Sequence, residues 1–384
     1  MKQVERIAYL YLLISLFFLR GLALFFMALP FLLKRKNPKK DFLFFPYAHK
    51  DNIGTVSRFQ IFLPLLERDK FSFDIFYTWS ADLEERIYYQ TKSRALEYFF
   101  LARVFRSRLF QVMKAGNYKS AFFQRGLFPN YYDQYTPYLE KLLTRLNRNV
   151  TVDFFDADYM RNKMLVDSIA MNCNKICVVN NFLAEYFSRI NSNVFINELA
   201  LRLTLYKAKS SYLINERTNI FWTGDVLNSE NLKPLIPILE KINETYPIQL
   251  TMVSRIVEGF ESNIIRRIDW TRETFFDELF RSDIAIYPAM EDTEFTRGKV
   301  AYKNLEYGAS ALPVVASPFG LSPHFENEKD VLLAHDLSEW ETQIVRLIKD
   351  EGLRKKFGEH IRLTTEKFHT VESAYKNLLK ILQE

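Results

Sequence analysis

The sequence predicts an α/β protein with two doubly wound domains and an N-terminal apolar helix. Residues 7–33 are almost wholly apolar, and after residue 40 short apolar runs alternate with amphipathic segments in two successive series. Such alternation is typical of parallel sheets covered by helices. Hydrophobic residues make up 48% of the 384 residues, with 11 glycines and 13 prolines. This composition excludes a disordered or collagen-like chain.

The N-terminal segment, residues 1–40, is predicted to associate with a membrane. Its apolar stretch from Ile7 to Leu33 exceeds the ~20 residues that span a hydrocarbon core. A charged Arg20 near the middle of this stretch is costly in a hydrocarbon core, and Pro30 would kink the last turns. The sequence leaves two membrane forms open: one tilted spanning helix, or a helix or short hairpin that lies in one leaflet with Arg20 snorkelling. A long buried helix of a soluble fold is the third interpretation. The basic cluster Lys34–Lys40 favours the cytoplasmic face and anionic lipid head groups.

Charge and cysteine content exclude two other classes of protein. The net charge is +6, but residues 1–40 hold eight basic residues and one acidic residue, so the remainder holds 44 basic and 45 acidic residues. Because a nucleic-acid footprint should lie on the folded domains, we expect no nucleic-acid partner. Cys173 and Cys177 are too few for a disulfide framework or a structural zinc site, and we expect both in the core.

The first alternating series predicts an N-terminal domain over residues 41–210. A strand, a helix and a second strand within residues 41–79 predict a βαβ unit with a parallel pair. The predicted strands are 41–46, 71–79, 120–124, 150–155 and 175–179, and the predicted helices are 56–68, 81–112, 132–147, 160–172 and 181–190.

The second series predicts a C-terminal domain over residues 211–365, after a hinge near 205–217, with residues 366–384 closing the chain as a helix. The predicted strands are 220–223, 249–253, 284–287 and 313–316, and the predicted helices are 231–246, 274–281, 300–310, 340–351 and 353–368. Open parallel sheets bind ligands beyond the carboxyl ends of their strands. Two such domains facing each other would therefore form one site in the cleft between them.

The most informative segment for chemistry is 297–320. Arg297-Gly298-Lys299 is predicted at the start of a helix, where free backbone N–H groups favour an anion. Lys299 and Lys303 would share one helix face, an unfavourable arrangement unless something negative lies between them. Glu306, one turn further, could accept hydrogen bonds from sugar or ribose hydroxyls. The competing interpretation is an ordinary solvated helix with scattered charges.

This segment resembles the donor-binding motif of family-4 glycosyltransferases, which have the GT-B fold: two Rossmann-like domains that face a cleft. Three other segments agree with that resemblance, which covers about residues 41–380: 151–158, 220–224 and 270–288. The resemblance implies retaining transfer from a nucleotide-sugar, without a cofactor and generally without a metal.

Site residues follow from the resemblance by matching position. Glu306 would hold the ribose hydroxyls, while Lys299 and Arg297 would neutralise the diphosphate leaving group. Gly54 and Thr55 match the glycine-rich turn that approaches the diphosphate, and residues 287–290 would lie beside the sugar. The remaining donor-binding candidates are Gly224, Gly298 and Lys303.

The sequence departs from the family pattern at two charged positions. The first Glu of the motif falls on Gly298, so we expect Glu294 or Glu291 to reach in from the preceding residues. The basic residue expected after Gly224 is replaced by Asp225, and Arg255 is the candidate that supplies the missing charge.

Three residues of the first domain are acceptor candidates. Asp156 and Asp158 follow a predicted strand and could position an acceptor hydroxyl or coordinate a cation. Equally, a loop carboxylate there could cap the helix that begins at Met160. His49 follows the first strand and could contact acceptor or phosphate, or remain a solvated loop histidine.

Together these features indicate a membrane-associated GT-B glycosyltransferase on the cytoplasmic face of a membrane. It would transfer a sugar, with retention, to a glycan or lipid-linked acceptor in surface polysaccharide or glycolipid assembly. The alternative is a catalytically inactive GT-B protein that serves as a membrane scaffold or partner subunit, as the changes at Gly298 and Asp225 suggest.

Overall fold

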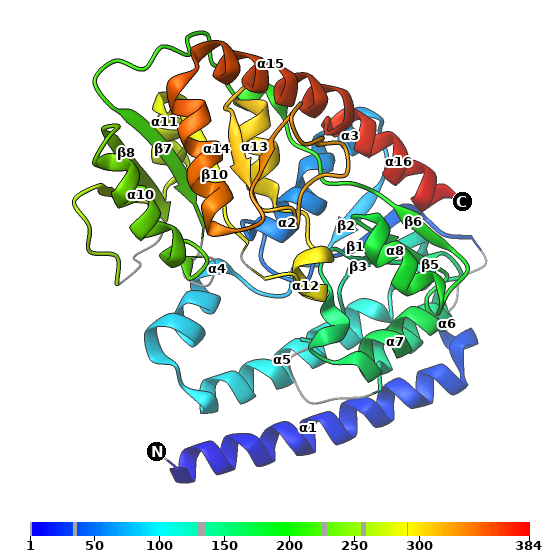
Figure 1. The fold of residues 1–384 in the computed structure, drawn as a ribbon. Coiled ribbons are helices and arrows are strands. Elements are labelled where there is room, and N and C mark those ends of the chain that lie inside the picture. The colour runs from blue at the N-terminus through cyan, green and yellow to red at the C-terminus, as the bar shows by residue number, and fades with distance from the viewer. Residues whose placement is uncertain (1, 34–36, 130–135, 225–228, 255–258, 290) are drawn as a thin grey trace. The chain divides into compact units, whose positions relative to one another are not determined.

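The computed structural model describes residues 2–33, 37–129, 136–224, 229–254, 259–289 and 291–384 (Figure 1). The chain divides into two compact units. The first unit comprises Met1–Glu198 and Ala374–Glu384, and the second comprises Leu199–Ser373. The division thus lies at residue 198 rather than 210, and the last residues of the chain belong to the first unit.

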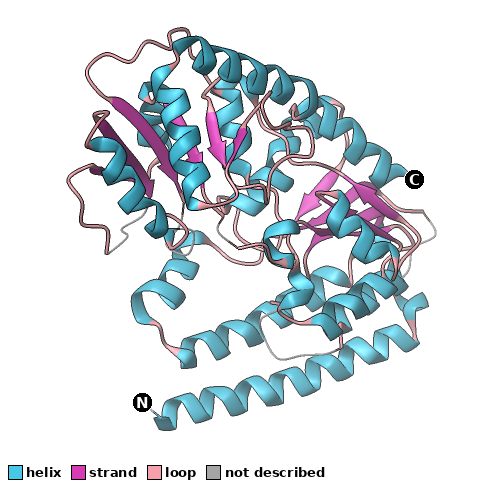
Figure 2. Cartoon of the chain, viewed as in Figure 1, coloured by secondary structure: helices cyan, strands magenta, loops and turns pink. Residues whose placement is uncertain are grey.

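In its described residues the first unit contains a six-stranded parallel sheet in the order β2-β1-β3-β4-β5-β6. Figure 2 draws the strands in magenta and the helices in cyan. The strands are β1 (Lys40–Phe45), β2 (Phe73–Ile75), β3 (Tyr118–Gln124), β4 (Val150–Phe154), β5 (Lys175–Val178) and β6 (Val194–Ile196). The helices are α1 (Lys2–Ala28), α2 (Ile53–Arg58), α3 (Leu63–Arg68), α4 (Ala81–Glu84), α5 (Arg94–Val112), α6 (Tyr138–Leu146), α7 (Lys163–Asn172), α8 (Asn181–Ser188) and most of α16 (Val371–Gln383).

Two helices predicted in this unit are interrupted. The helix predicted over 56–68 is broken into α2 and α3, because Pro64 lacks an N–H group and its ring collides with the preceding turn. The helix predicted over 81–112 gives way to the separate helices α4 and α5. Ser93 is the N-cap of α5, and its hydroxyl accepts a hydrogen bond from the Leu96 N–H.

The core of the first unit is aromatic and contains one buried ion pair. Residues 42–45 of β1 are at most 3% exposed, and the ring of Phe44 lies 4.5 Å from that of Phe59. Arg58 of α2 donates from Nε to Oδ2 of Asp153 on β4 at 3.1 Å, and both side chains are at most 1% exposed. The pair joins α2 to the centre of the sheet.

The second unit also contains a six-stranded parallel sheet in its described residues, in the order β12-β11-β10-β7-β8-β9. Its strands are β7 (Thr218–Thr223), β8 (Ile248–Ser254), β9 (Ile265–Asp269), β10 (Ile284–Tyr287), β11 (Val314–Ala316) and β12 (Leu332–Leu333). Its helices are α10 (Ile236–Asn243), α11 (Arg272–Arg281), α12 (Glu294–Arg297), α13 (Tyr302–Ala309), α14 (Leu337–Lys349) and α15 (Glu351–Phe368).

Three strands of the two sheets were not predicted, namely β6, β9 and β12. Each lies at an edge of its sheet. β9 reads Ile-Arg-Arg-Ile-Asp and is only partly buried, while β6 and β12 have three and two residues. Such short or polar segments lack the continuous apolar run that marks an interior parallel strand.

Candidate functional site

The candidate site of the second unit lies at the carboxyl ends of β7 and β10. These strands are neighbours, and the sheet continues from β7 through β8 and β9, and from β10 through β11 and β12. The strand order therefore reverses between β7 and β10. In open α/β sheets such a reversal is where ligands bind, outside the carboxyl ends. Gly224 and Pro288 are the first residues after the two strands.

Lys303 of α13 places its ammonium group at this edge. Its Nζ donates a hydrogen bond to the carbonyl oxygen of Thr223, the last residue of β7. The same atom lies 5.1 Å from the centre of the Trp222 ring and 5.8 Å from that of Tyr287. The lysine is thus held between the ends of β7 and β10 by a carbonyl and two aromatic faces.

Gly224 is required by this arrangement. A Cβ atom added at Gly224 would lie 2.7 Å from the Trp222 ring and 3.1 Å from the Lys303 Nζ. Any larger residue would push against the indole and the ammonium group. The predicted residues Gly224 and Lys303, 79 positions apart in the sequence, are therefore brought together by the fold.

Glu306 lies one turn along α13 in a half-buried position. Its Oε1 accepts a hydrogen bond of 2.9 Å from the hydroxyl of Tyr206. Burial raises the pKa of Glu306 to about 7, although the Tyr206 hydrogen bond and the positive charges of Lys303 and Arg272 lower it. The carboxylate therefore titrates near neutral pH, as groups at functional sites often do. Sequence reasoning missed Tyr206, which lies in the predicted hinge.

The residues before α13 differ from the prediction. The sequence predicted one helix over 300–310 with Arg297-Gly298-Lys299 at its start. Instead, α12 ends at Arg297, Gly298 caps it by donating to the Glu294 carbonyl at 2.8 Å, and α13 begins at Tyr302. The prediction that Lys299 and Lys303 share a helix face is therefore wrong, because Lys299 lies in the connection between two helices.

The predicted catalytic residues have different surroundings. Arg297 is exposed, and its Nε donates to Oδ1 of Asp292 at 2.5 Å. Lys299 is half-buried, with its Nζ 5.7 Å from the centre of the Phe295 ring. Glu294 is exposed in the first turn of α12. Arg297 thus already has a carboxylate partner, whereas Lys299 contacts an aromatic face.

A tight turn after β11 positions the Lys299 connection. Gly320 has φ +69°, and a Cβ there would lie 2.7 Å from the Tyr287 hydroxyl. Its carbonyl accepts a hydrogen bond of 2.8 Å from the Ala301 N–H. The turn therefore fixes the residues between α12 and α13 against the end of β10. Arg255, Asp225 and Met290, named from the sequence, lie outside the described residues.

In the first unit, Gly54 and Thr55 lie inside a helix rather than in a glycine-rich turn. The Asn52 side chain caps α2 by accepting a hydrogen bond of 3.0 Å from the Gly54 N–H, so the helix begins at Ile53. A Cβ at Gly54 would lie 3.0 Å from the Phe155 ring, and Thr55 is fully buried. The glycine therefore allows close ring packing, and its contact with a donor stays a prediction.

Asp156 and Asp158 form ion pairs with Arg125, which follows β3. Arg125 contacts Asp156 through Nη2 and lies 3.3 Å from Oδ1 of Asp158 through Nη1. Its guanidinium also lies over the rings of Tyr47 and Phe155, at 4.7 and 4.3 Å. Burial by itself would lower the pKa of Arg125, but the two carboxylates raise it by more, so the pKa lies above its usual value. The two aspartates thus share one cation from the protein itself, which offsets one of their two negative charges.

The structure excludes one of the two roles that the sequence left open for Asp156 and Asp158, namely capping of the following helix. The cap of α7 is Asn162, whose side chain accepts from the Leu165 N–H, so neither aspartate caps that helix. The sequence analysis missed Arg125, although its position directly after a buried strand could have marked it as a site residue. In the described ranges, no three His, Cys, Asp or Glu side chains gather as metal ligands. His49 is half-buried after β1, and its Nδ1 accepts from the Asp51 N–H at 3.2 Å.

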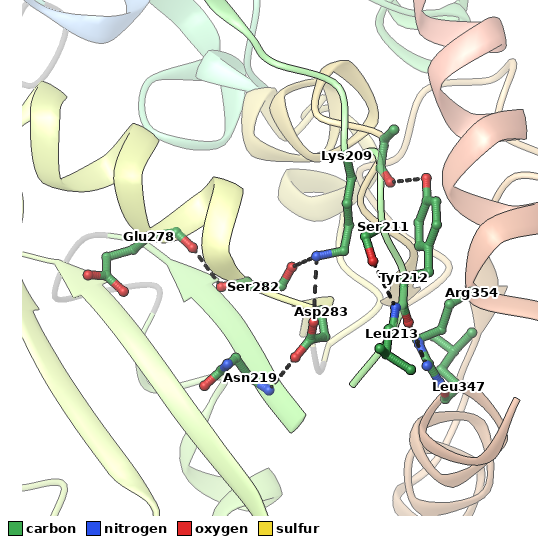
Figure 3. A network of polar contacts seen from close by, with 11 residues as sticks. Lys209, Ser211, Tyr212, Leu213, Asn219, Glu278, Ser282, Asp283, Leu347 and Arg354 are labelled. Carbon is green, nitrogen blue, oxygen red and sulfur yellow. Dashed lines mark hydrogen bonds and ion pairs between the residues drawn. The ribbon is translucent and has the colours of Figure 1, made fainter. Parts of the chain in front are cut away.

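A separate polar cluster lies at the amino-terminal edge of the second sheet (Figure 3). Lys209 donates to the Ser282 carbonyl at 2.6 Å and pairs with Asp283 at 3.5 Å, and Asp283 also accepts from the Asn219 N–H. An open cavity of about 730 Å³ adjoins it, lined by none of the predicted donor residues. These contacts attach the segment entering the second unit to the starts of β7 and β10.

Comparison with known proteins agrees with the predicted fold. Residues 238–380 match a family described as glycosyl transferase-like. No curated protein sequence matches the chain.

Solved structures match along most of the chain. Sucrose-phosphate synthase from Thermosynechococcus elongatus has a TM-score of 0.63 at 11% identity, over 89% of this chain and 98% of that chain. A glycosyltransferase from Rickettsia africae has a TM-score of 0.63 at 14% identity, over the same shares. Anabaena HepE, solved with UDP and glucose, has a TM-score of 0.64 at 11% identity, over 90% of this chain and 100% of that chain. The predicted GT-B fold and the resemblance to glycosyltransferases are thus confirmed.

Proposed function

We propose that this chain, a GT-B protein with a glycosyl transferase-like segment over residues 238–380, transfers a sugar from a nucleotide-sugar to an acceptor. The observation that carries the proposal is the cluster of Lys303, Gly224 and Glu306 at the strand reversal of the second sheet. An ammonium group held there suits a diphosphate, and a carboxylate one turn away suits ribose hydroxyls. The structure of Anabaena HepE with UDP supports a donor of this kind.

In the proposed reaction the bond between the anomeric carbon and the diphosphate oxygen breaks. The acceptor oxygen bonds to the same face of the sugar, and its proton passes to the leaving phosphate, so the configuration is retained. Lys299 and Lys303 stabilise the negative charge that grows on the diphosphate, the role for which other enzymes use a metal ion. No nucleophile from the protein is required by this route.

The acceptor would bind to the first unit. Arg125 holds Asp156 at the carboxyl edge of that sheet, where the carboxylate could orient an acceptor hydroxyl. We further propose a glycan or lipid-linked acceptor in surface polysaccharide or glycolipid assembly, reached at the cytoplasmic face of a membrane. The apolar helix α1 supports this part of the proposal.

Calorimetry on the full chain tests the donor site. Wild type and Glu306→Ala are titrated with nucleoside diphosphates and nucleotide-sugars, with Glu359→Ala, at an exposed residue of α15, as the matched control. We expect Glu306→Ala to weaken binding of the recognised nucleotide by about 1–3 kcal/mol, because hydroxyl groups of the ligand lose their partner. Failure of wild type to bind any of them would contradict the proposal and favour a catalytically inactive scaffold.

A further inference from the structure

Helix α1 has one face that packs against the first unit. Ala8, Leu12, Leu16 and Ala23 are at most 2% exposed, and they recur at helical spacing. This inward face contacts α5 and α6, and Figure 1 shows α1 running beside α5. The helix is therefore docked on the protein over most of its length.

The remaining surface of α1 is apolar and exposed. Phe17 is 75% exposed and Phe18 is 67% exposed. Soluble proteins rarely expose a contiguous apolar patch of this kind unless it binds a partner. The outward face consists of Val4, Ile7, Leu10, Leu13, Ile14, Phe17, Phe18, Leu24 and Phe25.

Helix α5 extends this surface with apolar and basic side chains. Leu96, Phe99, Arg103, Arg106 and Phe110 are exposed and follow one another at intervals of three or four residues, so they share one face. The Phe99 ring lies 5.2 Å from that of Tyr11, which joins this face to α1. Glu97, the acidic residue of α5, is half-buried. The combined surface is thus apolar with positive charge, and it complements anionic lipid head groups.

Arg20 is placed consistently with a helix that does not cross a bilayer. Its guanidinium lies 5.2 Å from the centre of the Tyr138 ring and lines an open cavity of about 1060 Å³ between α1 and α5. The arginine therefore contacts a ring of α6 at the border of the outward face, whose residues Leu13, Phe17, Phe18 and Leu24 line the same cavity. Gln3–Ala28 is long and apolar enough to cross a membrane. Crossing would require α1 to leave its seam and uncover the apolar side chains of α5.

We infer that α1 lies in the plane of an anionic membrane surface while docked on α5. Its outward face enters the boundary between head groups and acyl chains, and Arg103 and Arg106 contact lipid phosphates. This inference makes the membrane part of the proposed function specific, and it does not depend on the transferase reaction.

Vesicle binding of the full chain tests the surface. The protein is mixed with phosphatidylcholine vesicles with and without phosphatidylglycerol, and the bound fraction is measured by sedimentation. We expect Phe17→Asp combined with Phe18→Asp to reduce binding about tenfold or more, because both rings leave the acyl boundary. Leu363→Asp, an equally drastic change at a 62% exposed residue of α15, should leave binding unchanged.

The basic residues are tested separately. Arg103→Ala combined with Arg106→Ala should weaken binding to vesicles that contain phosphatidylglycerol and not to those without it. Arg189→Ala, at the exposed residue that follows α8, is the control. Calorimetry with the recognised nucleotide should give the same affinity for all these variants, so a failure of membrane binding stays distinguishable from a failure of the donor site.

Labelling distinguishes a helix in the plane from one that spans. Gln3→Cys and Asn37→Cys are treated, on sealed vesicles, with a maleimide that cannot cross the bilayer; Cys173 and Cys177 are buried, so wild type reports the background. Equal labelling of both positions from outside supports the inference. Protection of one position until detergent is added would overturn it. Absence of vesicle binding by wild type would also overturn it. So would a wild-type dimer in solution that the Phe17→Asp and Phe18→Asp changes dissociate, because the outward face would then bind a second copy of the chain.

Discussion

The hydroxyl of Tyr206 donates a hydrogen bond of 2.9 Å to Oε1 of Glu306. This contact joins the segment that enters the second unit to α13, the helix that carries residues of the proposed donor site. Because Glu306 has a pKa of about 7, which the hydrogen bond lowers, the pair decides how much of the carboxylate is ionised at neutral pH.

We therefore predict that donor binding depends on pH through Glu306. The ionised carboxylate accepts two hydrogen bonds from ribose, whereas the protonated acid has one fewer acceptor site, so affinity should fall as the pH drops through about 7. Tyr206→Phe removes a contact that lowers the pKa, and it should move the midpoint to higher pH. Calorimetry with the recognised nucleotide at several pH values measures both midpoints. Glu306→Gln should bind independently of pH, and equal midpoints in wild type and Tyr206→Phe would contradict the role of Tyr206.

Lys299 should matter more for turnover than for binding. Its positive charge is worth most when the diphosphate leaves, because negative charge grows on the phosphate in the transition state. We expect Lys299→Ala to lower kcat at least about tenfold while the donor Kd changes less. Donor hydrolysis or transfer is measured beside calorimetry, with Lys355→Ala on exposed α15 as the control. Equal losses in kcat and in affinity would contradict this role, and a loss of affinity with unchanged kcat would show that Lys299 only binds the ground state.

Gly224→Ala should disturb the donor site without unfolding the protein. The added Cβ would lie 2.7 Å from the Trp222 ring and would displace Lys303 from the Thr223 carbonyl. We expect a stability cost of about 1–3 kcal/mol, as for other overpacked positions, together with weaker donor binding. Urea unfolding and calorimetry measure the two effects. At Gly21 of α1 a Cβ would meet nothing within 4 Å, so Gly21→Ala should leave donor binding unchanged and should not destabilise the protein, since alanine favours a helix more than glycine does.

The Arg58–Asp153 pair should be the most sensitive electrostatic contact of the first unit. Both side chains are at most 1% exposed, so Asp153→Asn leaves a buried guanidinium without its counter-charge. We expect a loss of about 3–5 kcal/mol in the free energy of unfolding, measured by urea denaturation. The exposed pair Arg189–Glu185 provides the comparison: Glu185→Gln should cost no more than about 1 kcal/mol. Similar losses for both variants would contradict the importance of burial.

Much of the fold could be predicted because interior strands are apolar along their whole length. β4 and β10 are fully buried, and both were predicted almost to the residue. β9 was missed because its arginines alternate with isoleucines at a partly exposed edge. The break between α2 and α3 was missed because the apolar residues of the two short helices follow one another at the spacing of a single continuous helix.

The candidate site could be predicted only where its residues are close together in the sequence. Lys303 and Glu306 were found from one segment of α13. Tyr206 and Arg125 were missed because their partners lie about 100 and 31 residues away, so that only the folded chain shows the contacts. The wrong placement of Lys299 has a local cause, since Gly298 ends α12 and the chain runs four residues before α13 begins.

The sequence by itself determined the α/β class, the two parallel sheets, the apolar α1 and the residue types of the proposed donor site, because these follow from local periodicity and short motifs. Tertiary structure alone decided that Lys303 meets Thr223, that Tyr206 holds Glu306, that Arg125 pairs with two aspartates, and that α1 docks on α5. Parallel strands from distant parts of the chain end at one edge, and helix packing depends on which faces meet. Neither is recorded in the spacing of residues along the chain.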